Sequence, residues 1–366
     1  MQSHTVFITG AAGYVGAMLA ALWATRPDVE KIICLDKDPR PEFLTGGKII
    51  WISGVTAGTD WQSIVTAAEP DIVVNCAWQI REMYGNKAEQ WRLNVEGSDA
   101  IFDFAFSMSS VRKLIHFSTV ASYGAFPSNT IEHRFAENEP FRVSTYLYAE
   151  EKRIAEKHLE QKYATASNRP QVVVIRPAAI TGPRGRFMRI RFGLQAALSG
   201  QLRESWSHKI VSLLVSFVPI TKKWCRQFIH EDDVADILTL LAFSSLTAEY
   251  EVFNICPPGP VVTGKDMAKA VHKKPVMLPP ALIRIAFFFF WHVSRGAIPT
   301  SRGGWLSYSY PIAVDGSKLT KRYGYHYKYP SLEAFQYTDG RYEYFVPEPL
   351  RVHQKSHSTD LPKVEK

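Results

Sequence analysis

Short apolar segments alternate with longer amphipathic ones through the first half of the chain. The short segments have the length and composition of buried strands and cover residues 5–10, 31–36, 48–54, 71–77, 113–119 and 171–177. The longer segments between them predict helices, among them 14–25, 87–108 and 146–163. Apolar runs that end at Gly, Pro or Asp and alternate with helices predict a parallel sheet covered on both faces. The predicted fold class is therefore α/β.

Two later segments are unusually apolar. They are residues 210–220 (IVSLLVSFVPI) and 276–295 (VMLPPALIRIAFFFFWHVSR), and neither reaches the roughly 18 residues that span a bilayer. For 276–295 two interpretations stay open. It is either a buried helix of a substrate-binding lobe or a helix in the plane of a membrane, for which an apolar face with basic and aromatic flanks is typical. Its basic flanks are Lys273, Lys274 and Arg295.

The net charge of +8 is concentrated in one segment. Between Arg184 and Arg226 nine Lys or Arg residues stand against one acid, Glu204, so the rest of the chain is neutral overall. A local basic segment implies a local anionic partner. An anionic membrane surface fits, because the basic segment overlaps the apolar run 210–220. Nucleic acid is not expected, because the segment lacks the interleaved aromatic residues or groove-binding helix that such binding needs.

The composition is that of an ordinary globular protein. The 366 residues suffice for one large domain or for two that share a core, and 46% are hydrophobic and 21% charged. Four widely spaced cysteines (Cys34, Cys76, Cys225 and Cys256) form neither a disulfide framework nor a metal-ligand set, so we predict no metal site. The start of the chain lacks the pattern of a secretory signal, and we expect a cytoplasmic location.

Three glycines follow the first predicted strand in TGAAGYVG. Gly10, Gly13 and Gly16 allow a tight strand-to-helix turn and a close approach of the backbone to a pyrophosphate at the helix N-terminus. Asp36 closes the second predicted strand, 20 residues after Gly16. A carboxylate at that place can accept hydrogen bonds from the adenosine ribose and repels a 2′-phosphate. These residues together predict a dinucleotide site that prefers NAD.

Tyr148 and Lys152 are four residues apart in a strongly helical stretch, which places them on one helix face. Thr119 ends the fifth predicted strand, and open parallel sheets form their sites at the carboxyl ends of strands. A phenol with an ordinary pKa near 10 is a poor base at neutral pH, but a neighbouring ammonium group and a cationic nicotinamide lower that pKa. We therefore expect Tyr148 to take a proton from a substrate hydroxyl, Lys152 to tune it, and Thr119 to hold the substrate oxygen.

These motifs resemble those of the extended short-chain dehydrogenase/reductases, the group with NAD-dependent sugar epimerases and dehydratases. The matching pieces occur in the family's order between residues 5 and 256: TGAAGYVG, Asp36, VVNCA (73–77), RLNVEG (92–97), HFSTVASYG (116–124), YAEEK (148–152), RPAAITGP (176–183), RQFIHEDDVAD (226–236) and VFNI (252–255). The resemblance implies a Rossmann-type doubly wound parallel sheet with a smaller, discontinuous, mainly helical substrate lobe. It divides the chain into an NAD-binding domain (1–182 and 226–256), the substrate lobe (183–225 and 257–349) and a mobile tail (350–366).

The resemblance also assigns residues to roles. It implies that Thr119, Tyr148 and Lys152 are catalytic. It implies cofactor contacts from Gly10, Gly13, Tyr14, Val15, Gly16, Asp36, Val55, Ala77, Asn94, Tyr148, Lys152 and Pro177, and substrate contacts from Trp78, Arg184 and Arg226. A homodimer through helices such as 87–108 and 146–163 is common in the family and is a further possibility.

Some positions depart from the family's pattern. Val55 stands where an acid near the adenine is usual, Ala179 replaces the Asn that holds a diphosphate in many nucleotide-sugar enzymes, and a late Arg-Pro-Gly-Asp motif is missing. Val120 and Ala121 follow Thr119 in place of the Asp–Glu pair of dehydratases, which disfavours elimination. We predict an NAD-dependent epimerase-type oxidoreductase for a sugar nucleotide or a lipid-linked sugar. The alternatives are a net dehydrogenase of the 3β-hydroxysteroid type acting on a sterol or other amphiphilic alcohol and, less favoured, a non-catalytic dinucleotide-binding module.

Overall fold

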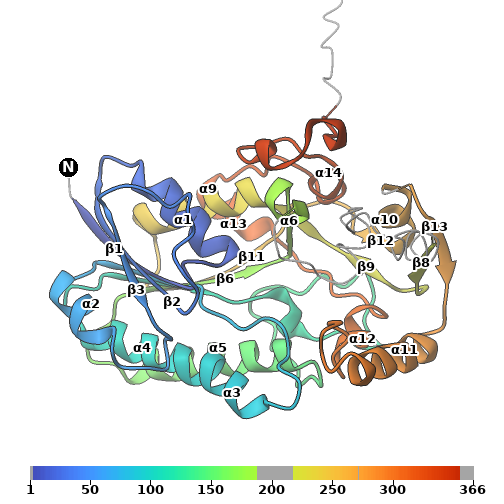
Figure 1. Ribbon diagram of the computed structural model, residues 1–366, viewed down its shortest axis with the longest axis horizontal. Coiled ribbons are helices and arrows are strands. Elements are labelled where there is room, and N and C mark those ends of the chain that lie inside the picture. The colour runs from blue at the N-terminus through green and yellow to red at the C-terminus, as the bar shows by residue number, and fades with distance from the viewer. Residues whose placement is uncertain (1–2, 188–216, 271, 355–366) are drawn as a thin grey trace, which may run out of the picture.

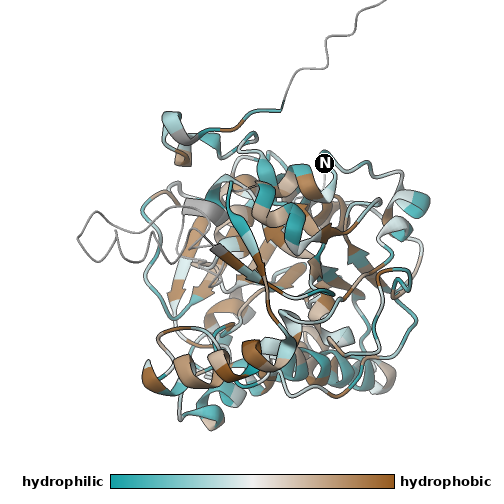
Figure 2. Ribbon diagram, turned by 90° about the vertical axis from the view of Figure 1, so that its right-hand side faces the viewer, coloured by the Kyte–Doolittle hydropathy of each residue, from teal (hydrophilic) through white to brown (hydrophobic). Residues whose placement is uncertain are grey.

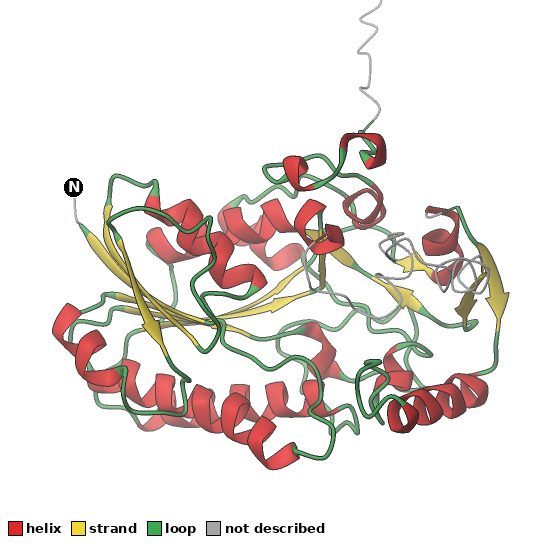
Figure 3. Cartoon of the chain, viewed as in Figure 1, coloured by secondary structure: helices red, strands yellow, loops and turns green. Residues whose placement is uncertain are grey.

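A seven-stranded parallel sheet forms the centre of the computed structural model, which describes residues 3–187, 217–270 and 272–354 (Figures 1 and 3). Its strand order is β11-β6-β5-β4-β1-β2-β3. The strands are β1 (His4–Thr9), β2 (Val29–Asp36), β3 (Ile49–Ser53), β4 (Ile72–Asn75), β5 (Lys113–Phe117), β6 (Gln171–Pro177) and β11 (Tyr250–Ile255). The predicted Rossmann-type α/β fold is confirmed.

Helices cover both faces of this sheet (Figure 1). On β1, Val6 and Ile8 face one apolar core and Phe7 faces the other, as the two-residue period of a strand requires. The first core is completed by α1 (Tyr14–Ala24), α9 (Glu231–Phe243) and α13 (Ser317–Tyr323), and the second by α2 (Gln62–Ala68), α4 (Gly97–Ser107) and α5 (Leu147–Thr165). Burial on both faces explains why the strands read as continuous apolar runs.

The strand order reverses between β1 and β4. From β1 the chain proceeds to β2 and β3 on one side, and then returns to place β4 on the other side of β1. The loops that leave β1 and β4 therefore diverge and open a crevice at the carboxyl ends of these strands. Open α/β sheets bind their ligands at such a point.

The predicted helix 87–108 contains an irregular turn. Residues Lys87–Trp91 form α3, Arg92–Glu96 form a π-helical turn, and α4 continues from Gly97. A π-helical turn adds one residue to the helical repeat and often lies at a functional site. Here the turn contains Asn94, a predicted cofactor contact.

A smaller lobe lies at the opposite end of the molecule from α2 (Figure 1). Its elements are β8 (Phe217–Ile220), β9 (Cys225–Arg226), β12 (Val262–Thr263), α10 (Gly264–Ala270), β13 (Lys274–Met277), α11 (Pro280–Val293), α12 (Gly304–Ser307) and α14 (Ser331–Gln336). A third apolar core, which includes Trp224, Phe228, Met267 and Phe335, holds part of the lobe together. The short pair β7 (Ala179–Thr181) and β10 (Phe228–His230), with α6 (Pro183–Phe187), connects the lobe to the sheet. The predicted domain limits stay a prediction.

Parts of the predicted basic and apolar segments lie outside the described residues. These parts are 188–216, which include most of the basic segment and the start of the run 210–220. Among the described residues, no helix combines the length and the apolar content needed to cross a bilayer.

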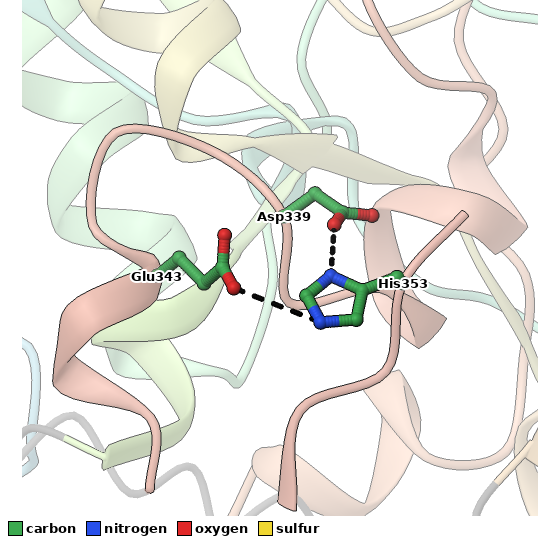
Figure 4. A group of neighbouring side chains, drawn as sticks. All are labelled: Asp339, Glu343 and His353. Carbon is green, nitrogen blue, oxygen red and sulfur yellow. Dashed lines mark hydrogen bonds and ion pairs between the residues drawn. The ribbon is translucent and has the colours of Figure 1, made fainter. Parts of the chain in front are cut away.

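The chain that follows α14 turns back on itself. It forms short 3-10 turns at Glu343–Phe345 and Glu348–Leu350. The N–H of Thr338 donates to the carbonyl of Val352, and the N–H of Val352 donates to the Thr338 hydroxyl, both at 2.8 Å. The imidazole of His353 lies between Asp339, at 2.6 Å, and Glu343, at 3.7 Å (Figure 4). The first residues of the predicted tail 350–366 are thus tied to 338–343, and residues 355–366 lie outside the described part.

Candidate active site

The glycine loop after β1 has no room for side chains. Gly10 has φ +68°, and a Cβ there would lie 2.6 Å from the backbone nitrogen of Ala77. A Cβ on Gly16, in the first turn of α1, would lie 2.2 Å from the carbonyl oxygen of Gly10. Strand, loop and helix therefore pack backbone against backbone, and the free N–H groups of the first turn of α1 stay accessible for an anion.

Asp36 connects the end of β2 to this loop. Its Oδ2 accepts a hydrogen bond from the backbone N–H of Ala12 at 2.8 Å, and its Oδ1 accepts one from Asp38 at 2.9 Å. Burial raises the pKa of the carboxyl group, and the two backbone bonds oppose that rise. The carboxylate is therefore fixed at the rim of the crevice, as the predicted ribose contact requires.

A buried polar network holds β1 and β4 together below the loop. The hydroxyl of Thr9 donates to Asn75 Oδ1 at 2.8 Å and accepts from the backbone N–H of Ala77 at 3.2 Å. His116 lies 3.4 Å from the amide of Asn75, and burial lowers its pKa well below the ordinary value. Because His116 stays neutral, the network fixes Ala77 opposite Gly10 without placing a charge in the core.

The crevice itself is lined by residues from the ends of β1, β2, β3 and β4. The predicted residues that line it are Gly10, Gly13, Asp36, Val55, Ala77 and Trp78. Asn94 stands behind this wall, where its amide exchanges hydrogen bonds with the backbone of Gln79 at 2.7 and 3.1 Å and donates to Glu151 at 2.7 Å. In this structure Asn94 therefore acts on the loop after β4, since its amide is used by Gln79 and Glu151.

The three predicted catalytic residues come together at the carboxyl end of β5. Thr119 caps the 3-10 turn Val120–Tyr123, and its hydroxyl accepts from the N–H of Ala121 at 3.2 Å. Tyr148 lies in the first turn of α5 and hydrogen-bonds with Thr119. Burial raises the pKa of the Tyr148 phenol, and the Thr119 bond only partly offsets that rise. The expected lowering of this pKa is thus not produced by the protein alone.

Lys152 lies one turn further along α5 and is 3% exposed. Its ammonium donates to the backbone carbonyl of Phe117 and lies 3.7 Å from the centre of the Trp78 ring. Burial lowers the pKa of Lys152 to about 7. Lys152, the residue expected to tune Tyr148, is therefore only about half protonated at neutral pH.

A buried ion pair supports this region from below. Glu156, one turn after Lys152, pairs with Arg176 of β6 and accepts a hydrogen bond from the Ser118 hydroxyl at 2.7 Å. Arg176 also donates to the hydroxyl of Tyr123 at 2.8 Å. These bonds fix the segment that carries Thr119. Glu156 lies outside the sequence motifs, so no role was predicted for it.

Aromatic and charged side chains continue from the catalytic residues into the smaller lobe. The ring of Tyr146 lies 5.7 Å from that of Tyr148. Arg226 lies over the Tyr308 ring at 5.8 Å. Burial raises the pKa of the Tyr146 phenol, the charge of Arg226 opposes that rise, and Tyr308 and Glu82 add to it. The predicted substrate residue Arg226 is therefore close to the catalytic end of the crevice.

Arg184 is placed differently. It is 2% exposed, its guanidinium donates to the backbone carbonyl of Tyr14 at 3.2 Å, and it faces the rings of Tyr14 and Tyr342 at 5.0 and 4.9 Å. The hydroxyl of Tyr14 donates to Glu231 at 2.5 Å, and burial raises the pKa of Glu231 to about 7. Arg184 thus joins a buried cluster behind α1, while Arg226 lies beside Tyr308.

Two further predicted cofactor contacts lie at element ends. Val15 is buried in the first turn of α1, and Pro177 ends β6, where it pairs with Ile255 of β11. Their direct contacts with a cofactor stay predictions.

The sequence profile of the NAD dependent epimerase/dehydratase family matches residues 6–256. The chain belongs to this family. It is accordingly an NAD-dependent enzyme of the extended short-chain dehydrogenase/reductase class, as the motifs predicted. No curated protein matches the sequence.

Solved structures of similar fold cover most of the chain. The dTDP-glucose 4,6-dehydratase of Bacillus anthracis, in complex with NAD, is 15% identical with a TM-score of 0.64, over 91% of this chain and 94% of that one. WbmH of Bordetella bronchiseptica, with NAD+, is 18% identical with a TM-score of 0.66, over 92% and 96%. The UDP-glucose 4-epimerase of Thermotoga maritima, with UDP-glucose, is 19% identical with a TM-score of 0.65, over 91% and 96%. At these identities the similarity establishes the fold.

Proposed function

We propose that the protein is an epimerase-type oxidoreductase that oxidises a secondary hydroxyl of a sugar nucleotide or lipid-linked sugar, with transient hydride transfer to NAD. The observation that carries the proposal is the pairing of Thr119 with Tyr148, next to Lys152 and beside the glycine loop. Structures of similar fold include a UDP-glucose 4-epimerase with UDP-glucose and a UDP-galactose 4-epimerase, and they support the substrate class.

The residues around the crevice fit NAD. The backbone of Gly10, Gly13 and Gly16, with the first turn of α1 at Tyr14 and Val15, would hold the pyrophosphate, because side chains are excluded there. Asp36 would accept hydrogen bonds from the adenosine ribose, and the backbone at Val55 would border the adenine. The nicotinamide half would lie along Ala77, Tyr148, Lys152 and Pro177, with Asn94 holding the wall. Bound NAD supplies reversible storage of a hydride.

The catalytic side chains divide the proton chemistry among them. The Thr119 hydroxyl would donate a hydrogen bond to the substrate oxygen, and the Tyr148 oxygen would remove the proton of the substrate hydroxyl as the carbon is oxidised. The Lys152 ammonium would stabilise the phenolate, whose formation burial opposes. Tyr148 would give the proton back when the stored hydride returns to the opposite face of the same carbon, so epimerisation would need no net oxidant.

The substrate contacts are part of the same proposal. Arg226 lies beside Tyr146 and Tyr308 and would pair with a phosphate of the substrate. Trp78, stacked under Lys152, would contact the sugar. Arg184 would reach a substrate only by leaving its cluster with Tyr14 and Tyr342.

The net dehydrogenase is the second candidate function. It is favoured by Ala179 at the position of the diphosphate-binding Asn and by the apolar residues of α11, both of which suit an amphiphilic alcohol such as a sterol. A non-catalytic role is disfavoured, because Thr119, Tyr148 and Lys152 are all present and adjacent.

The proposed partners of the protein are a membrane surface and a second copy of the chain. We propose a cytoplasmic protein with contact to an anionic membrane surface, and a homodimer through α4 and α5, which pack against each other on one face of the sheet (Figure 1). Light scattering of the purified protein would test the dimer.

The fate of the hydride tests the function. Purified protein would be incubated with excess NAD and either UDP-glucose or a lipid extract, while NADH absorbance and product isomers are followed. Isomer formation without NADH is expected, and steady NADH accumulation with the lipid extract would establish the dehydrogenase instead. Tyr148→Phe should keep NAD binding and lose at least a hundredfold in turnover. Tyr163→Phe, on the same helix, is the matched control, and unchanged turnover in Tyr148→Phe would overturn the proposal.

A further inference from the structure

The helix α11 exposes a continuous apolar face. Its outward side chains are Leu282, Ile285, Phe288, Phe289 and Val293, with exposed fractions of 49, 62, 63, 57 and 67%. A surface helix of a globular protein normally carries charged or polar residues on its outer face. In Figure 2 the helix is brown along much of its length. The face therefore has the character of a binding surface.

The inner face of the same helix already satisfies the needs of folding. Ile283 and Trp291 are buried, and Phe287 packs edge-on against Tyr308 with ring centres 5.1 Å apart. Trp291 also meets Tyr84, at 5.5 Å, in the loop after β4. The inner side of the helix thus fits the buried-helix interpretation. The outer side lacks a described neighbour layer, and for that side the membrane interpretation stays a prediction.

The apolar face continues onto adjacent segments. Val276 and Met277 of β13 are 38 and 50% exposed, and Ile298, after the helix, is 44% exposed. An exposed apolar surface that extends over several segments is rare on a monomeric soluble protein and marks a place of interaction with a protein or a membrane.

The charges around this surface select among possible partners. Residues 267–314 contain six Lys or Arg and no acid: Lys269, Lys273, Lys274, Arg284, Arg295 and Arg302. A second copy docked face to face would bring the same positive charges together. An anionic bilayer offers both an apolar layer and negative headgroups, and Tyr84 at the edge of the face is 42% exposed, as an aromatic residue at a membrane interface would be.

The surface is also next to the candidate active site. Tyr308, which contacts Phe287, lies beside Arg226, and a Cβ on Gly303 would lie 2.3 Å from the backbone of Thr145 and Tyr146. Tyr146 is two residues before Tyr148. One side of α11 is therefore a wall close to the catalytic residues, while its other side is the exposed apolar face.

We propose that the outer face of α11 docks in the plane of an anionic bilayer, and that the active site takes an amphiphilic substrate from that bilayer. The docking stands on α11 alone, whereas the substrate class rests on the proposed function. The lipid part of the substrate would lie towards α11 and its hydroxyl would lie at Thr119 and Tyr148.

Vesicle sedimentation tests the docking without any turnover. The probes are vesicles of phosphatidylcholine alone and of equal parts phosphatidylcholine and phosphatidylglycerol. Wild-type protein should sediment with the mixed vesicles, and added salt should weaken the binding. Ile285→Asp and Phe289→Asp should each reduce partitioning about tenfold, as expected when one large apolar side chain stops being buried. Ile64→Asp is the matched control, because Ile64 is 48% exposed on α2 and should leave partitioning unchanged.

Three outcomes would reject the docking. Absence of wild-type sedimentation rejects it directly, and equal sedimentation of all variants moves binding away from α11. Loss of a dimer in the α11 variants, seen by light scattering, would make the face a contact between copies. If the active site takes its substrate from the bilayer, turnover of the lipid extract presented in the mixed vesicles should fall in the α11 variants as their partitioning falls. If vesicles bind as expected but Tyr148→Phe keeps full turnover, the docking stands and the proposed function falls.

Discussion

The ammonium nitrogen of Lys152 lies 3.7 Å from the centre of the Trp78 ring. A residue of α5 and a residue of the loop after β4 therefore meet over the crevice, although 74 positions separate them in the chain. The ring face and the Phe117 carbonyl partly replace the water that burial removes from the ammonium, and the pKa is still lowered to about 7. The charge that is proposed to act on Tyr148 thus lies against the ring of Trp78, the residue predicted to contact the substrate.

Replacing Lys152 with Met should remove this charge while keeping most of the side chain's volume. We expect kcat to fall at least a hundredfold, and the ascending limb of the pH–rate profile to move to higher pH because the phenolate of Tyr148 loses its stabilising cation. Lys157→Met, on an exposed position of the same helix, is the control. An unmoved pH profile would show that Lys152 does not tune Tyr148.

Removal of the Asp36 carboxylate should change cofactor preference. In Asp36→Ala the affinity for NAD should fall about tenfold, since the proposed hydrogen bonding to the ribose would be lost, and NADP should gain relative to NAD because a charge that would repel a 2′-phosphate is removed. Titration of both cofactors against wild type and against Asp60→Ala, an exposed acid outside the crevice, measures the effect. Equal preference in wild type and variant would remove Asp36 from the site.

The glycine loop should not tolerate a methyl group. A Cβ at position 16 would lie 2.2 Å from the Gly10 carbonyl, so Gly16→Ala must separate α1 from β1. We expect NAD binding to be lost and the melting temperature to fall. Gly47→Ala is the matched control, since its Cβ would meet no atom within 4 Å. Similar melting temperatures for the two variants would contradict the close packing.

Glu231 should make stability depend on pH. Its pKa rises from 4.5 to about 7 on folding, so the unfolded chain loses this proton first and the free energy of unfolding falls as pH rises through that range. The full rise in the pKa of Glu231 corresponds to a change of roughly 3 kcal/mol in the free energy of unfolding. Urea unfolding of wild type and Glu231→Gln between pH 4 and pH 8 should show wild type losing up to that amount relative to the variant. The pKa of Asp233 is also raised by burial, but Asp233 is present in both proteins, so its contribution cancels in the difference between wild type and Glu231→Gln. A difference that stays constant with pH would mean that Glu231 titrates normally.

The sequence predicted the sheet well, because buried strands have a local pattern, while the catalytic roles stay predictions. The six apolar runs became strands with ends shifted by one or two residues, and the helix predicted at 146–163 became Leu147–Thr165. The spacing of Tyr148 and Lys152 and the end of the strand before Thr119 were enough to place these residues together. A seventh strand was not predicted, although the matching piece VFNI (252–255) lies within it, in β11.

Features that depend on distant contacts were not predicted. The π-helical turn Arg92–Glu96 has no residue pattern of its own, and it gives Asn94 partners in the loop after β4. Arg184 was predicted as a substrate contact, but the sequence did not show that the rings of Tyr14 and Tyr342 lie against its guanidinium. Helical periodicity alone did not reveal that α11 is apolar on both its buried and its exposed side.

The pairing of β11 with β6 has a consequence during synthesis. Residues 250–255 supply the seventh strand, whereas β6 ends at residue 177, so more than 70 further residues must be made before the sheet is complete. At about 5–20 residues per second, the ribosome leaves this hydrophobic strand edge unpaired for several seconds. A nascent chain that stalls before residue 250 would present β6 to other chains, and such a fragment should aggregate or be held by a chaperone.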